Sequence, residues 1–187
     1  MGSSAVAGPI AGAGPAGRVA AFGVDAGVIA AWVGAAAGVG WWVRRRQRSL
    51  SPAQADSVAL GTLVAPTVVT FAVMEASARQ ATPGKTLVGL RVQSVEGHRL
   101  TVAHALARNA AKLAPWQLAH TAVFRIAAGS QQRRWQALAV AAQLMVVASA
   151  VTLLRDPHDR SWHDLLTRTR VVQVPRQTHT SVPADRP

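Results

Sequence analysis

Long stretches without charge dominate this chain and decide what it can fold into. Residues 58–74 and 135–154 contain no Asp, Glu, Lys or Arg, and residues 19–43 contain only Asp25. About 20 apolar residues of helix cross the hydrocarbon core of a bilayer. Because backbone amides in lipid must be paired internally, such segments cross as helices. We therefore expect an all-α membrane protein, a bundle of three or four transmembrane helices.

The domain is predicted to cover residues 18–174, between flexible tails at residues 1–17 and 175–187. The first tail consists mainly of Gly, Ala, Ser and Pro, a composition typical of disorder. The spans are placed at about 19–43, 58–75, 113–129 and 135–154.

Two of these spans contain features that complicate them. Pro66 is expected to kink the second span, with Thr62 nearby to satisfy the freed carbonyl. The third span contains Gln117, His120 and Arg125. It therefore either crosses the membrane, re-enters it or lies on its surface.

The polar region between the second and third spans is predicted to lie at the cytoplasmic face. Alternation at residues 90–95, followed by Glu96-Gly97, predicts a short β-hairpin with residues 98–102. Thr82-Pro-Gly-Lys85 is typical of a type II turn. It lacks the first glycine of a phosphate-binding loop.

One basic stripe is expected to meet the lipid surface. His104, Arg108 and Lys112 are four residues apart, so they share one face of a helix. Such a helix suits the headgroup layer as an interfacial element. We expect Arg108, Lys112 and Lys85 to face lipid headgroups.

The net charge of +12 comes from 18 Arg and 2 Lys against 8 acidic residues. The arginines flank the apolar stretches, so the expected partner is a bilayer with anionic lipids, not nucleic acid. With four spans, one side holds 13 basic residues and the other holds six. The positive-inside rule then places both termini in the cytoplasm, at the cell (plasma) membrane. The cluster at 44–48 opposes this, and a three-span arrangement would put it inside.

Three stretches resemble the RDD family of small multi-pass membrane proteins. Arg18-Val-Ala-Ala-Phe-Gly-Val-Asp25 is similar to the family's opening, where an arginine begins the first span and an aspartate lies within it. Thr82-Pro-Gly-Lys-Thr-Leu-Val-Gly-Leu-Arg-Val92 resembles its central loop. Asp159-Arg-Ser-Trp-His-Asp164, followed by Thr169-Arg-Val-Val172, resembles its carboxyl-terminal signature, with Asp164 as the second aspartate. The resemblance implies a membrane domain but no reaction, and ion exchange is only a proposal for some members.

The family-signature residues Arg18, Asp25 and Asp164 are candidates for ion pairs. Arg18 and Asp25 are seven apart, so they lie within about 20° on one helix. A carboxylate inside a span is costly and needs a partner or a proton. Asp25 is therefore either a packing ion pair or an ion site. Asp164 is expected to fold back and pair with Arg18 or Arg108.

A proton or ion relay is a second use for the buried titratable groups. Asp25, Glu75 and His120 are its candidates, because each falls in or beside a span. His120 could equally be a hydrogen-bonded packing residue. The acidic and histidine residues from Asp156 to Asp164 resemble a metal cluster, but they offer few converging ligands, so no metal is expected.

The functional expectation follows from these residues. The chain has no Cys and no complete catalytic set, so we expect neither an enzyme nor a cofactor. Small size and Gly/Ala-rich helix faces favour an accessory or assembly subunit of a membrane complex, with a membrane-protein partner or a homo-oligomer. The alternative is a small transporter or cation/proton exchanger that uses Asp25. No internal repeat supports that alternative.

Overall fold

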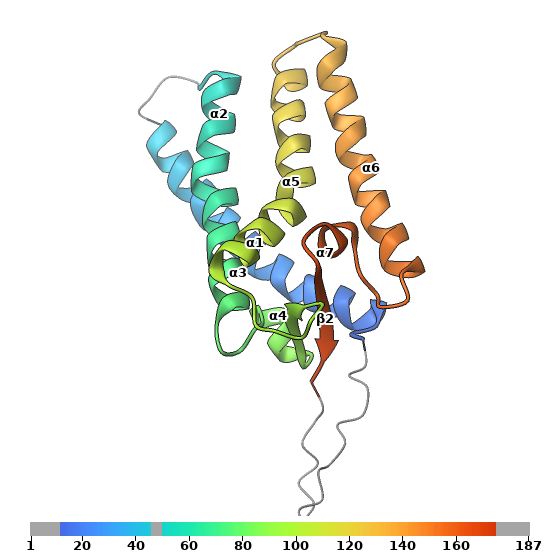
Figure 1. Cartoon of the computed structure of the whole chain (residues 1–187). Helices are drawn as coiled ribbons and strands as arrows, with labels where there is room; N and C mark the ends of the chain where they lie inside the picture. Colours follow the sequence, from blue (N-terminus) through green and yellow to red (C-terminus); the bar gives the residue numbers. More distant parts are fainter. Residues whose placement is uncertain (1–11, 46–49, 175–187) are drawn as a thin grey trace, which may run out of the picture.

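The long helices form a bundle that α1 crosses obliquely, and the small elements gather at one end of it (Figure 1). The computed structural model describes residues 12–45 and 50–174. The long helices, which we call rods, are α1 (Pro15–Arg44), the run of α2 (Pro52–Ala59), η1 (Leu60–Val64) and α3 (Ala65–Ala76), then α5 (Val102–Ala127) and α6 (Arg133–Arg155). The small elements are α4 (Pro83–Leu87), β1 (Leu90–Ser94), α7 (Trp162–Leu166) and β2 (Thr169–Gln173). We call the end that carries them the base.

Three helical stretches are long and apolar enough to cross a membrane: Pro15–Gly38, Pro52–Ala76 and Arg133–Arg155. They overlap the first, second and last predicted spans. Their large apolar side chains, such as Phe22, Val69 and Leu144, are exposed. A surface of this kind is stable against lipid but not against water. The fold is therefore a helical membrane fold with a small sheet.

The second rod changes its helical pitch just before Pro66. The π-helix η1 lies at Leu60–Val64, and Pro66 follows at the start of α3. Pro66 has no N–H to offer the carbonyl of Thr62, four residues back. The indole of Trp32 donates to that oxygen instead, at 3.0 Å, while the Thr62 hydroxyl donates to Val58. The structure thus has a π-helical turn before Pro66, and α1 rather than the Thr62 side chain satisfies the carbonyl.

Helix α5 is continuous and contains Pro115. Figure 1 shows that its first half crosses the base and its second half rises beside α6. It contacts both α3 and α6. Since α1 begins at the base and β2 ends there, the rods run alternately away from the base and back to it (Figure 1).

The sheet corrects the predicted hairpin. Strand β1 pairs antiparallel with β2, in a register from Leu90↔Gln173 to Ser94↔Thr169. The expected turn does form, because Gly97 donates to Ser94 O at φ 90°. Residues 98–102 form no strand, however. The carboxyl-terminal segment supplies Val171, which is buried opposite the buried Val92 of β1. The two polar residues after the turn, His98 and Arg99, are exposed and would add no such apolar contact.

The first predicted tail is too long. Gly12 bridges to Val172, Ala13 N donates to Val171 O at 3.2 Å, and α1 begins at Pro15. Residues 1–11 and 175–187 of the predicted tails lie outside the described residues. The apolar core also lies at the base, where Ala21, Leu90 and Val171 belong to one buried cluster.

Candidate functional site

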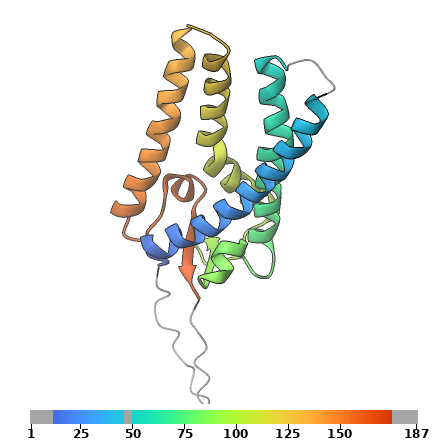
Figure 2. The same cartoon turned by 180° about the vertical axis from the view of Figure 1, so that it is seen from behind.

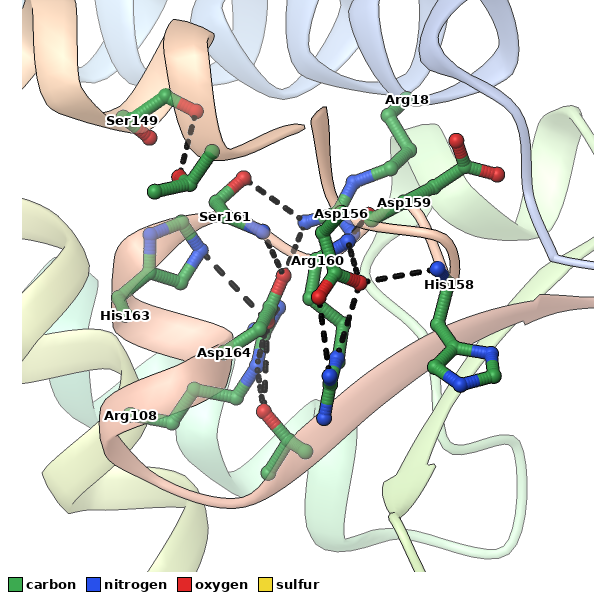
Figure 3. Close-up of polar contacts among 12 residues, drawn as sticks. Arg18, Arg108, Ser149, Asp156, His158, Asp159, Arg160, Ser161, His163 and Asp164 are labelled. Atoms are coloured by element: carbon green, nitrogen blue, oxygen red, sulfur yellow. Dashed lines mark hydrogen bonds and ion pairs between the residues drawn. The ribbon is translucent and has the colours of Figure 1, made fainter. Parts of the chain in front are cut away.

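Asp164 lies in the first turn of α7 and is fully buried. One carboxylate oxygen accepts from Ser161 N at 3.1 Å and from Arg18 of α1. The other accepts from Arg108 of α5, through Nη2 at 2.7 Å and Nε at 3.1 Å. Figure 3 shows Arg18 and Arg108 reaching this carboxylate. Both of the predicted partners therefore contact Asp164.

The loop before α7 holds a second acceptor for Arg18. Asp156 Oδ1 accepts from His158 N at 2.9 Å and from Arg160 Nε at 3.0 Å, which closes the loop on itself (Figure 3). Asp159 lies at φ 54°, a conformation that Asp tolerates better than most residues. Its carbonyl accepts from Arg18 Nη1. The loop thus fixes the guanidinium that pairs with Asp164.

Glu75, at the end of α3, is fully buried and is surrounded by donors. Arg108 Nη1 lies 2.9 Å from both carboxylate oxygens. Lys85 Nζ donates at 2.9 Å and Asn109 Nδ2 at 2.8 Å. Arg108 therefore bridges Glu75 and Asp164, and so ties α3 to α7 through α5.

Asp25 is buried on α1 and has neutral donors. Thr82 Oγ1 donates at 2.6 Å and Gly84 N at 2.9 Å. A Cβ at Gly84 would lie 2.1 Å from Ala21 O, so only glycine permits this approach of α4 to α1. The predicted type II turn at Thr82-Pro-Gly-Lys85 is instead the start of α4, with Pro83 in its first turn. The start of α4 therefore supplies the hydrogen-bond donors for the Asp25 carboxylate.

These contacts join into one network. Lys85 Nζ also lies 3.3 Å from Thr82 Oγ1, so a continuous path leads from Arg18 to Asp25. Its six charged groups are Arg18, Lys85, Arg108, Asp25, Glu75 and Asp164. Three cations and three anions balance, as buried charges must. We call these six residues the charge network.

The surroundings of α7 set the charges of Asp164 and His163. Burial alone would raise the pKa of Asp164, but Arg108 and Arg18 outweigh it and hold that pKa well below its usual range. Burial lowers the pKa of His163 to about 3, against the opposing attraction of Asp164. Asp164 is therefore an anion and His163 a neutral imidazole at neutral pH.

Two of the three residues that were predicted to face headgroups are buried. Arg108 is 1% exposed and Lys85 is 6% exposed. The prediction was wrong because the basic stripe of α5 turns inward, where Glu75 and Asp164 compensate its charge. Lys112 is half-buried, and its ammonium lies near the rings of Phe22 and Phe71.

The predicted relay is not continuous. Glu75 and Asp25 belong to the charge network, but the His120 imidazole contacts Trp116 O on its own helix, at 2.9 Å. Within residues 12–45 and 50–174, no hydrogen bond joins His120 to either carboxylate. Nor do three His, Asp or Glu side chains converge as metal ligands in the described part of the chain.

Several neutral partners escaped sequence analysis. Thr169 donates to Asp164, Asn109 to Glu75, and Thr82 to Asp25. Adjacent residues such as Arg108 and Asn109 point to different faces of a helix. Their spacing therefore did not predict that both contact Glu75. Thr82 lies inside a stretch that resembled a family motif, which was the one available clue.

Comparisons with known proteins identify the family of this chain. Searches among curated proteins and among solved structures found no match. A family model described as RDD family matches residues 12–168, which is most of the chain and includes the whole charge network. This membrane-type helical protein therefore belongs to the RDD family.

Proposed function

We propose that this protein is a non-catalytic accessory or assembly subunit of a membrane complex. The observation that carries the proposal is the saturation of its buried carboxylates. Glu75 and Asp164 each pair with two cations. A cation or proton exchanger needs a carboxylate that loses and regains its counterion. These two are occupied by the fold itself, so their charge stabilises structure.

The open face of α1 supports a partner. A Cβ added at Gly23, Gly27, Gly34 or Gly38 would meet nothing within 4 Å. Small residues four apart allow another helix to approach closely in lipid. Since no helix in the described part of the chain packs there, this face is available to a different protein or to a second copy.

The same proposal includes the orientation. We place the base in the cytoplasm at the plasma membrane, with four crossings, because both described ends of the chain lie at the base (Figure 1). Exposed basic residues that could meet anionic headgroups remain there: Arg79, Arg91, Arg99, Arg155 and Arg168. The chain lacks Cys, so single cysteines report sidedness cleanly. Ala53→Cys and Gln131→Cys should react from outside and Glu96→Cys from inside. Opposite sidedness of positions 53 and 131 would contradict four crossings.

The test of the subunit role is purification from native membranes in mild detergent. A heterologous partner at stoichiometric yield is expected, and Gly27→Leu should remove it without loss of the protein. Gly61→Leu is the matched control, because Gly61 is also exposed with nothing within 4 Å of an added Cβ but lies on the second rod. No partner, or a partner indifferent to Gly27→Leu, would count against this role.

One observation favours the transporter alternative. Asp25 accepts only from neutral donors and lines a large cavity. It is thus the carboxylate of the network with the least compensation. An exchanger would move protons against a cation gradient in proteoliposomes with an internal pH dye. Asp25→Asn would abolish that movement, whereas Asp56→Asn, at the other end of the bundle, would not.

A further inference from the structure

A large cavity lies between α1 and α6. Figure 2 shows these helices close together at the base and diverging away from it. The cavity has a volume of about 980 Å³. Ile29 and Val33 line it from α1, and Met145, Val146 and Leu153 line it from α6. Ligand pockets have volumes of about 300–1,000 Å³, so this one is large enough for a hydrocarbon chain.

The base end of this cavity is charged. Arg18, Asp25, Lys85, Arg108 and Lys112 line it. The charge network is neutral by itself, so a protonated Lys112 adds a fourth cation to three anions. Among the described residues, Lys112 has no carboxylate within ion-pair distance. Its ammonium lies 5.9 Å from the Phe22 ring centroid and 5.8 Å from that of Phe71.

An uncompensated cation in such a place is unfavourable, and burial accordingly lowers the pKa of Lys112 to about 7. Aromatic faces attract it only weakly at these distances, and removal of charge from water costs more than they return. An anion beside Lys112 would restore neutrality. Because the walls above it are apolar, the fitting ligand joins an anionic group to a hydrocarbon chain.

We propose that this cavity binds an anionic lipid, with the head on Lys112 and the acyl chain between α1 and α6. The head can be a phosphate or a carboxylate, since both accept hydrogen bonds from an ammonium. A partner helix in the same place would need a carboxylate of its own beside Lys112. The lipid is favoured because the bilayer already surrounds both diverging helices.

The test is native mass spectrometry of the delipidated protein, titrated with lipids of one acyl composition. Phosphatidylglycerol should bind about tenfold more tightly than phosphatidylcholine. Oleate tests whether a carboxylate can replace the phosphate head. Inorganic phosphate tests whether the head binds without an acyl chain. Binding by phosphatidylglycerol alone identifies a phospholipid, and additional binding by oleate extends the site to fatty acids. Equal affinity for the two phospholipids would overturn the proposal, as would inorganic phosphate binding as tightly as phosphatidylglycerol.

Two variants locate the site. Lys112→Gln should abolish the preference for the anionic lipid, whereas Lys112→Arg should keep it. Arg133→Gln, which removes an exposed charge at the other end of the bundle, is the matched control and should change nothing. Because Lys112 has no ion-pair partner to leave behind, Lys112→Gln should remain folded. If Lys112→Gln still prefers phosphatidylglycerol to phosphatidylcholine, the lipid head does not bind at Lys112.

A second pair tests the chain. Ala150 lines the cavity from α6, so Ala150→Trp should fill it and weaken binding of both phospholipids. Val147 is exposed on the same helix and does not line the cavity, so Val147→Trp should bind normally. Equal binding by the two tryptophan variants would mean that lipid attaches elsewhere on the protein.

Discussion

The two ends of the bundle are held together by different forces. At the base, charged groups from α1, α3, α4, α5 and α7 form a neutral network. At the other end, Asp56 of α2 accepts only from Gln117 and Thr121 of α5, at 2.9 and 2.7 Å. Among the described residues, every ion pair between different elements lies at the base.

The difference indicates where the fold obtains its specificity. Buried charges tolerate few arrangements, because each must meet its counterion. Apolar helix faces tolerate many, since lipid and protein are equally apolar. The base therefore defines one structure, while the far end can adapt to lipid or to a partner. The variants below test this difference between the two ends of the bundle.

The largest effect is expected from Asp164→Ala. This change leaves Arg18 and Arg108 buried without their shared carboxylate, which costs about 3–5 kcal/mol for such pairs. The protein should lose most of its folded population, measured by thermal unfolding in detergent. Glu96→Ala is the control, because its pair with Arg168 is exposed and exposed pairs contribute little to stability. Similar losses of thermal stability from both variants would show that burial of the charge network does not determine the cost of breaking an ion pair.

The next largest effect concerns a glycine at the base. Gly84→Ala puts a Cβ 2.1 Å from Ala21 O, so α4 must move away from α1 and release Asp25. Overpacking of this kind costs about 1–3 kcal/mol. Thermal unfolding should report that loss, whereas Gly61→Ala, with open space around it, should be neutral or slightly stabilising. A harmless Gly84→Ala would mean that α4 is not tightly docked.

The sequence predicted the spans better than the base, for a physical reason. Length and apolarity are local properties, so the spans predicted at residues 19–43, 58–75 and 135–154 overlap three helices that are long and apolar enough to cross a membrane. The pairing of β1 with β2 joins segments far apart in the chain, and no local pattern encodes it. A hairpin was predicted because Glu96-Gly97 supplies a turn, and that turn exists without a second strand behind it.

The same limit applies to the charge network. The pairing of Asp164 with Arg18 or Arg108 was predictable, because a resemblance and opposite charge pointed to it. The direction of the basic stripe was not. A helix with Arg108 and Lys112 on one face looks amphipathic, and only the positions of Glu75 and Asp164 show that the charged face points inward.

Acid should weaken the base before the far end. His163 is neutral in the fold because its pKa is lowered from 6.5 to about 3, whereas in the unfolded chain it titrates near its ordinary value. Below about pH 6.5 the unfolded state therefore binds more protons, and stability falls by about 1 kcal/mol over the first pH unit. Asp164, whose pKa is also lowered, adds a further loss below its ordinary value of 3.8.

The variant His163→Gln isolates the first part of that profile. Melting temperatures measured against pH should flatten between neutrality and pH 5, with the steeper loss at lower pH retained. His158→Gln, on an exposed side chain two residues after Asp156, should leave the profile unchanged. If His163→Gln titrates as the wild type does, another group governs the acid response.

The smallest effect is expected away from the base. Trp32→Phe removes the indole that donates to Thr62 O, 3.0 Å away, where Pro66 supplies no N–H. Hydrogen bonds between helices in lipid average about 0.6 kcal/mol, so the melting temperature should fall only slightly. Trp41→Phe, which removes an exposed indole elsewhere on α1, should have no effect. A loss from Trp32→Phe as large as that from Asp164→Ala would remove the contrast, because the far part of α1 would then be as tightly specified as the base.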